Sequence, residues 1–192
     1  MAKPFIGTGD HVTDDYFLTT QRLGFREWTM QDIPLAISLW GDVMVTNLID
    51  ARGQLTHDQV TERLTKEIAS MKQYGVQYWP IFELATGEFL GCCGLRPYRL
   101  DDGTYELGVH LCADRWGRGY ATEAGAAVIN YAFEKLGAKG LFAGHHPRNA
   151  ASRNFLQKLG FRYTHDEYYP PTGLQHPSYL LSLEEFNSGK KD

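Results

Sequence analysis

The chain is 192 residues long, which suits one ordinary domain or at most two very small ones. Its residues are 43% hydrophobic and 22% charged, close to the globular average, and this composition argues against a disordered or fibrous protein. A formal net charge of -4 provides no overall basic field, so a dedicated nucleic-acid binder is not expected. The same charge is compatible with a cationic substrate.

The sequence shows neither a secretory leader nor an apolar run long enough to span a bilayer. Its three cysteines, Cys92, Cys93 and Cys112, are an odd number, which favours a reducing compartment over a disulfide framework. The adjacent pair lacks the two-residue gap of a metal or redox motif, so we expect small core residues there. These features together predict a cytoplasmic protein without a membrane partner.

Hydrophobic periodicity and turn residues predict the elements in chain order. Two helices begin with a capping-box pattern, Thr29 with Asp32 and Thr56 with Gln59. The expected elements are a strand around 23–25, helices at 29–40 and 56–74, strands at 79–84, 89–96 and 105–112, a helix at 120–136, a strand at 139–146, a helix at 149–159, a strand from 161 onward and a strand at 179–183.

The order of these elements, βααβββαβαββ, indicates one α/β (α+β) domain. A strand–helix–strand unit inside an otherwise antiparallel meander implies a mixed, mostly antiparallel sheet with helices on its faces. We expect a loose arm at residues 1–17, the folded domain at 18–187 and a short tail at 188–192.

The segment most informative about chemistry runs from Asp114 to Ala124, directly after a strand and at the start of a helix. Gly117 and Gly119 let backbone N–H groups turn toward one point, and the helix N-terminus adds unpaired donors and a positive dipole. This combination suits a phosphate or pyrophosphate. The segment lacks the Gly-Lys-Ser/Thr of a P-loop and the third glycine of a Rossmann loop, so neither of those classes is expected.

The residues WGRGYATEA, preceded by YELGVHLCADR, resemble the acetyl-CoA pyrophosphate loop of the GNAT superfamily of N-acetyltransferases. Gly119 and Ala121 fit its Gln/Arg-x-x-Gly-x-Gly/Ala pattern. Trp116 takes the Gln/Arg position, as is usual in the branch that resembles the Rim ribosomal-protein N-terminal acetyltransferases. Two further blocks, TQRLGFREWTMQD and NAASRNFLQKLGF, are similar to that branch and lie in family order.

The resemblance implies a strongly twisted mixed sheet that splays between its fourth and fifth strands to admit acetyl-CoA, with no metal cofactor. Backbone groups of Val109, His110 and Leu111 would pair with the pantetheine arm, and Asn149 would bond a pantetheine amide. The basic side chains Arg148, Arg153 and Lys158 would either approach the ribose phosphate or form a solvated helix face. The loop expected to hold the pyrophosphate comprises Arg115, Trp116, Gly117, Arg118, Gly119, Tyr120, Ala121 and Thr122.

Direct attack of an amine on a thioester needs a base for the amine, a donor for the oxyanion and an acid for the leaving thiolate. Many relatives place a tyrosine acid seven residues after the asparagine, but Leu156 stands there, so the resemblance assigns this role to Ser152. A main-chain N–H near Val109 to Leu111 would serve the oxyanion.

Glu106 is the preferred base, because it shares a strand face with His110 and Gly108 leaves room beside it for substrate or cofactor. Asp166 and Glu167 are the rival bases. The adjacent His145 and His146 are not expected to share a metal, since neighbouring strand residues point to opposite faces.

The sequence therefore predicts a cytosolic acetyl-CoA-dependent N-acetyltransferase, monomeric or homodimeric, whose acceptor is a protein N-terminus or a small amine. An acyl-CoA-binding module without turnover is the alternative, motivated by Leu156. The aromatic and proline residues expected either to line the acceptor groove or to pack in the core are Trp79, Tyr168, Tyr169, Pro170 and Pro171.

Overall fold

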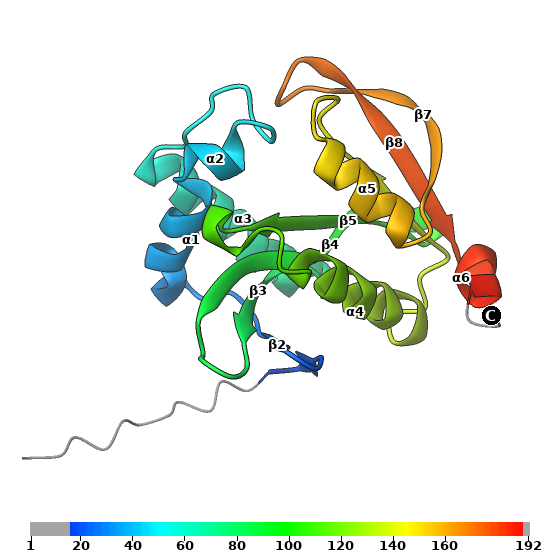
Figure 1. Ribbon diagram of the computed structural model, residues 1–192, viewed down its shortest axis with the longest axis horizontal. Coiled ribbons are helices and arrows are strands. Elements are labelled where there is room, and N and C mark those ends of the chain that lie inside the picture. Colours follow the sequence, from blue (N-terminus) through cyan, green and yellow to red (C-terminus); the bar gives the residue numbers. More distant parts are fainter. Residues whose placement is uncertain (1–15, 190–192) are drawn as a thin grey trace, which may run out of the picture.

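The computed structural model describes residues 16–189 as one eight-stranded sheet flanked by helices (Figure 1). The strand order is β1-β2-β3-β4-β5-β6-β8-β7, and among these strands only the β5–β6 pair is parallel. The strands are β1 (Leu18–Thr19), β2 (Leu23–Phe25), β3 (Tyr78–Glu83), β4 (Phe89–Arg99), β5 (Thr104–Leu111), β6 (Gly140–Gly144), β7 (Arg162–Tyr169) and β8 (Leu174–Ser182). The predicted mixed, mostly antiparallel α/β fold is confirmed.

The helices form where the sequence supplies periodic apolar residues between clear end signals. The Thr56–Gln59 capping box is present at the start of the long helix, and Gly75 ends that helix at a φ of 71° that favours glycine. The helices are α1 (Ile33–Trp40), α2 (Val43–Thr46), α3 (His57–Tyr74), α4 (Tyr120–Glu134), α5 (Ala150–Lys158) and α6 (Leu183–Gly189). Among residues 16–189, none of these helices has both the length and the apolar character needed to cross a membrane.

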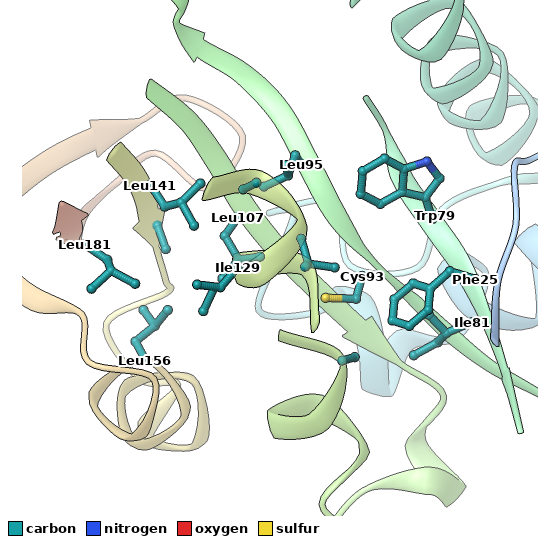
Figure 2. Packing of buried hydrophobic residues seen from close by; sticks show 14 of the residues in the cluster. Phe25, Trp79, Ile81, Cys93, Leu95, Leu107, Ile129, Leu141, Leu156 and Leu181 are labelled. Atoms are coloured by element: carbon teal, nitrogen blue, oxygen red, sulfur yellow. The ribbon is translucent and has the colours of Figure 1, made fainter. Parts of the chain in front are cut away.

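The two faces of the sheet carry separate hydrophobic cores. Alternating residues divide between them, so that Tyr78 and Cys92 pack with α1 and α3, whereas Trp79 and Cys93 pack with α4. Figure 1 shows α1 to α3 grouped apart from α4 and α5. Figure 2 shows the α4-side core, in which Ile129 lies over strand residues of β2 to β6.

Both adjacent cysteines are therefore core residues, as predicted. Burial raises the pKa of the Cys92 and Cys93 thiols and that of Cys112, the last to about 11. All three thiols consequently remain protonated and weakly reactive at neutral pH.

The parallel strands β5 and β6 pair only at their beginnings. Their pairing ends at Glu106 and Phe142, although β5 continues to Leu111 and β6 to Gly144. On its other side β5 stays paired with β4 as far as Leu111. The last five residues of β5 therefore have a free edge toward β6, which is the expected splay.

Four elements differ from the sequence-based expectation. The short β1 and α2 and the C-terminal α6 were not predicted, and β8 begins at Leu174 instead of 179. Residues 188 and 189, expected in the tail, belong to α6. The tail's last residues, 190–192, and residues 1–15 of the predicted arm lie outside the described residues.

Candidate active site

The glycine-rich loop delivers backbone donors to the surface at the start of α4. Gly117 and Gly119 have φ values of 75° and 81°, conformations that glycine adopts without the strain of a side chain. Gly119 is the N-cap of α4 and offers no side-chain acceptor, while the first intrahelical bond is donated by the Glu123 N–H. The N–H groups of Tyr120, Ala121 and Thr122 therefore point outward without an intrahelical acceptor.

Two contacts fix the first turn of α4 against the edge of the sheet. The Tyr120 hydroxyl donates to Glu83 Oε1 at 2.5 Å. Glu123 accepts from the Thr20 hydroxyl at 2.5 Å and from Arg22 Nε at 2.7 Å. Although burial opposes the charge of Glu123, these hydrogen bonds hold its pKa below the ordinary value. The donors of the loop are thus held in place before any ligand binds.

The charged and aromatic side chains of the loop have different surroundings. Arg115 is already paired, with Nη1 2.7 Å from Glu88 and Nε 3.1 Å from Asp114. Arg118 is exposed, and its guanidinium has no hydrogen-bond partner among the described residues. Trp116 is half-exposed and donates from Nε1 to the Leu111 carbonyl at 3.0 Å. Arg118 is therefore the cation of this loop that is available to an anion.

The free edge of β5 presents the backbone of alternate residues. The Cys112 N–H donates to the Leu90 carbonyl, so by antiparallel alternation His110 also bonds to β4. Val109 and Leu111 then direct their N–H groups to the side where β6 no longer pairs. His110 differs from these two neighbours, because its side chain lies in the α1-side core, 3.3 Å from Trp40 Nε1.

Helix α5 and its N-cap carry the block NAASRNFLQKLGF. Asn149 is its N-cap, and Oδ1 accepts from the Ser152 N–H at 3.0 Å, which leaves the amide Nδ2 as a donor. Among the described residues, the Ser152 hydroxyl has no hydrogen-bond partner. Leu156 is buried in the α4-side core, with 3% of its surface exposed. The three basic residues Arg148, Arg153 and Lys158 are all exposed.

Glu106 lies where the β5–β6 pairing ends. Its Oε1 accepts from the Tyr78 hydroxyl at 3.2 Å. Burial raises the pKa of Glu106, against the opposing effects of Arg96 and the Tyr78 hydrogen bond. The expectation that Gly108 leaves room for substrate or cofactor is wrong, because a Cβ at Gly108 would overlap the Tyr78 ring. Gly108 instead lets Tyr78 reach across β5 to Glu106.

The rival carboxylates lie on β7 in more open surroundings. Asp166 is exposed and accepts from the Tyr163 hydroxyl at 3.3 Å. Glu167 is partly exposed and accepts from the Tyr98 hydroxyl at 3.1 Å. Both carboxylates are thus more open to solvent than Glu106.

The side chains of the adjacent histidines have different partners. His145 faces Tyr179, whereas His146 Nδ1 accepts from the Arg148 N–H at 3.1 Å. Across residues 16–189, no group of three or more His, Cys, Asp or Glu side chains is arranged to hold a metal ion.

A groove of about 500 Å³ lies on the α3 side of the sheet. Its walls come from the segment after α2, from α3, from the end of β4 and from the β7–β8 turn. The Ala51 N–H donates to the Pro171 carbonyl at 2.9 Å, which joins two of these walls, and Figure 1 shows the two loops approaching each other. Of the five aromatic and proline candidates, only Tyr169 and Pro171 line this groove, and Trp79 is instead a fully buried core residue.

Sequence reasoning missed four residues at these sites: Arg22 and Glu123 at the loop, Tyr78 beside Glu106, and Arg63 at the groove. Arg22 and Glu123 lie inside the two blocks that carried the resemblance, so their position in those blocks was a usable signal. No local pattern marked Tyr78 or Arg63, whose surroundings arise only when α3, β3 and β5 meet.

A parallel strand pair that separates beside a helix N-terminus with free N–H groups is the arrangement expected of an acetyltransferase fold. Residues 22–162 match the family model described as the acetyltransferase (GNAT) domain. The chain therefore belongs to the GNAT family and is an N-acetyltransferase. The predicted enzyme is confirmed, and the alternative of a binding module without turnover is set aside.

Two curated relatives and one solved structure illustrate this similarity. The uncharacterized protein YkkB of Bacillus subtilis (strain 168) is 37% identical over 94 residues, which are 48% of this chain and 55% of YkkB. The uncharacterized N-acetyltransferase p20 of Bacillus licheniformis is 26% identical over 145 residues, covering 76% of this chain and 82% of p20. A putative ribosomal-protein-serine acetyltransferase from Vibrio cholerae superposes with a TM-score of 0.75 at 18% identity, covering 88% and 99% of the two chains.

Proposed function

We propose that the enzyme transfers the acetyl group of acetyl-CoA directly to a primary amine while both substrates are bound. The observation that carries this proposal is the position of Glu106, a buried carboxylate with a raised pKa, at the point where β5 and β6 separate. A base at this point lies beside the free edge of β5, where the resemblance puts the pantetheine arm.

The residues around the splay suit acetyl-CoA, which supplies the thioester that the amine attacks. The outward N–H groups of Tyr120, Ala121 and Thr122, with the Arg118 guanidinium, form a cradle for the pyrophosphate. The space beside Gly117 and Gly119 is open to a ligand. A Cβ at Gly117 would meet nothing within 4 Å, and one at Gly119 would meet only Arg22. The free edge at Val109 and Leu111 and the Asn149 amide would hold the pantetheine arm.

Glu106 acts as the base in this proposal. An ammonium acceptor must lose a proton before it attacks, and a carboxyl whose pKa is raised toward neutrality accepts that proton more readily than an ordinary glutamate. Tyr78 holds Oε1 by its hydroxyl, so the second oxygen remains to receive the proton, directly or through water. Asp166 and Glu167 remain the alternatives, but they lack this burial.

The remaining two roles fall to groups on either side of the splay. A main-chain N–H of Val109 or Leu111 donates to the thioester oxygen as negative charge develops on it. Ser152, whose hydroxyl has no partner among the described residues, protonates the departing thiolate. Leu156 does not take this role, because its side chain is apolar and turned into the core.

The Rim-like branch supplies a possible acceptor class, a protein N-terminus. The loop's Trp116 and the second block support that branch, and the similar Vibrio cholerae structure is described as a putative ribosomal-protein-serine acetyltransferase. A small amine fits the groove equally well by size, since about 500 Å³ accommodates a small molecule or one peptide terminus. The acceptor loops vary independently of the cofactor loop, so the fold leaves both classes open.

A thiol-release assay with acetyl-CoA tests the proposal against a panel of polyamines, aminosugars, amino acids and peptides with free N-termini. We expect at least one amine to raise the rate above acetyl-CoA hydrolysis. Replacement Glu106→Gln should then lower kcat/KM about 100- to 10,000-fold. Asp166→Asn and Glu167→Gln are the matched controls. The assignment of the base fails if either control abolishes the rate while Glu106→Gln retains it.

A further inference from the structure

The groove on the α3 side is lined by more cationic than acidic side chains. Its lining includes the acids Asp50, Glu62 and Glu67 and the cations Arg52, Arg63, Lys66 and Arg96. Three of these cations are paired within the groove: Arg52 with Asp50 at 2.6 Å, Lys66 with Glu62 at 2.6 Å, and Arg96 with Glu67. One positive charge, that of Arg63, is left over.

Arg63 lacks a polar partner although it is largely buried. No hydrogen bond or ion pair of its guanidinium is found among residues 16–189, and its Nε is buried without an acceptor. The guanidinium stacks on Trp40, 4.7 Å from the centre of the ring. A buried guanidinium N–H without an acceptor costs about 1–3 kcal/mol, and Arg63 lines the groove, so an anionic ligand that enters the groove would complete it.

The neighbouring acids are not free to serve Arg63. Glu67 is 1% exposed and already accepts from both Arg96 and the Tyr78 N–H. Asp50 accepts from the backbone N–H, Nε and Nη2 of Arg52. Burial and the charge of Arg96 lower the pKa of Arg63, as expected for a cation left without its own counter-ion.

Arg63 also interacts electrostatically with the proposed base. Its charge acts on Glu106, His110 and Tyr169, which ties the groove wall to the end of the β5–β6 pairing. A ligand anion at Arg63 would therefore belong to a molecule whose other end approaches Glu106.

We propose that Arg63 binds a carboxylate of the acceptor, so that the substrate is a small primary amine that also carries a carboxylate group. A guanidinium matches the two oxygens of a carboxylate with two parallel hydrogen bonds. A doubly charged phosphate is disfavoured, because three carboxylates line the same groove. This inference rests on the proposed function, since it names the acceptor of the same site.

Matched acceptor pairs test the inference: glycine, β-alanine and γ-aminobutyrate, each compared with its carboxamide. We expect the wild-type kcat/KM to favour at least one amino acid over its amide by about 10- to 100-fold, the worth of a hydrogen bond to a charged group. In Arg63→Gln that preference should vanish, mostly through a higher KM for the amino acid. Arg63→Lys should keep part of the preference, because it retains the charge without the fork.

Lys72→Gln on the same helix is the control, since Lys72 is an exposed cation outside the groove. It should leave both rates unchanged. Equal rates for acids and amides in the wild type, or an equal loss of both in Arg63→Gln, would overturn the inference while leaving acetyl transfer to amines intact.

Binding can be followed without turnover because Arg63 lies on Trp40. Titration of the wild type with the amino acids should change the tryptophan fluorescence saturably, and the carboxamides should not. Arg63→Gln should lose the response. If no amine is acetylated, the proposed function fails, and this titration still decides whether Arg63 is a carboxylate site: a missing response in the wild type refutes it.

Discussion

Gly119→Ala tests the cofactor loop most sharply, because its effect on stability can be separated from its effect on binding. Gly119 has φ 81° and ψ −2°, and an alanine held there costs about 1–2 kcal/mol. An alanine Cβ would meet only Arg22 Nη2, at an ordinary contact distance of 3.5 Å. The protein itself therefore offers no steric obstacle, and Tm should fall by about 2–8 °C.

The new methyl group would instead occupy the space through which a phosphate approaches the N–H groups of α4. Loss of one hydrogen bond to a charged group is worth about 1.5–3 kcal/mol. The Kd for acetyl-CoA, measured by isothermal titration calorimetry, should therefore rise roughly 10- to 150-fold.

Gly137→Ala is the matched control. Gly137 follows the C-terminal end of the same helix with φ 68°, and a Cβ there would meet nothing within 4 Å. The two variants should lose similar stability, but only Gly119→Ala should lose affinity. Equal Kd values for acetyl-CoA in both variants would refute the assignment of this loop to the pyrophosphate.

Three further predictions concern single side chains. Burial favours the neutral form of Glu106, so its ionisation lowers the stability of the protein above the raised pKa and not below the ordinary pKa of about 4.3. In urea unfolding, Glu106→Gln should therefore gain stability over the wild type as the pH rises from the ordinary pKa to the raised one. A stability difference that does not change with pH would contradict the raised pKa. Leu156→Tyr introduces the tyrosine that many relatives place here, but the larger side chain overfills the core. The variant should therefore lose about 1–3 kcal/mol of unfolding free energy in urea and release thiol no faster than the wild type. A gain in rate would show that this position reaches the thiolate. Arg22→Met should lower the free energy of unfolding by about 1 kcal/mol and weaken acetyl-CoA binding, because Glu123 loses its partner at the start of α4. Lys66→Met, which breaks the exposed pair Lys66–Glu62, is the control for stability, and no loss is expected there.

Much of the fold followed from the sequence because its long elements are locally consistent. The capping box of α3, the glycine that ends it and the alternation along β5 all agree with the final structure. The short β1 and α2 carry too few residues for a period to be visible. The first half of β8 reads as polar, and it becomes a strand because β7 and β6 pair with it on either side.

The site divides in the same way. Gly117, Gly119 and the start of α4 were predictable, because a tight turn between a strand and a helix depends on residues that are adjacent in the sequence. The partners of Glu106 and the isolation of Arg63 were not, since they depend on which side chains α3, β3 and β4 bring together. The net charge of -4 suggested a cationic acceptor, whereas the local charge of the groove favours one with a carboxylate.

The most direct test of acetyl transfer at the splay combines two measurements. Initial rates are measured with the amine that the enzyme accepts, and the mass of the intact protein is followed by mass spectrometry. We predict intersecting lines when acetyl-CoA is varied at several amine concentrations, and an N-acetylated product formed in equal amount to free CoA. The protein incubated with acetyl-CoA alone should keep its mass, because the proposed mechanism uses Glu106 and Ser152 as base and acid and not as nucleophiles, and burial keeps the thiols of Cys92 and Cys93 protonated. Parallel lines together with an acetylated protein would contradict direct transfer.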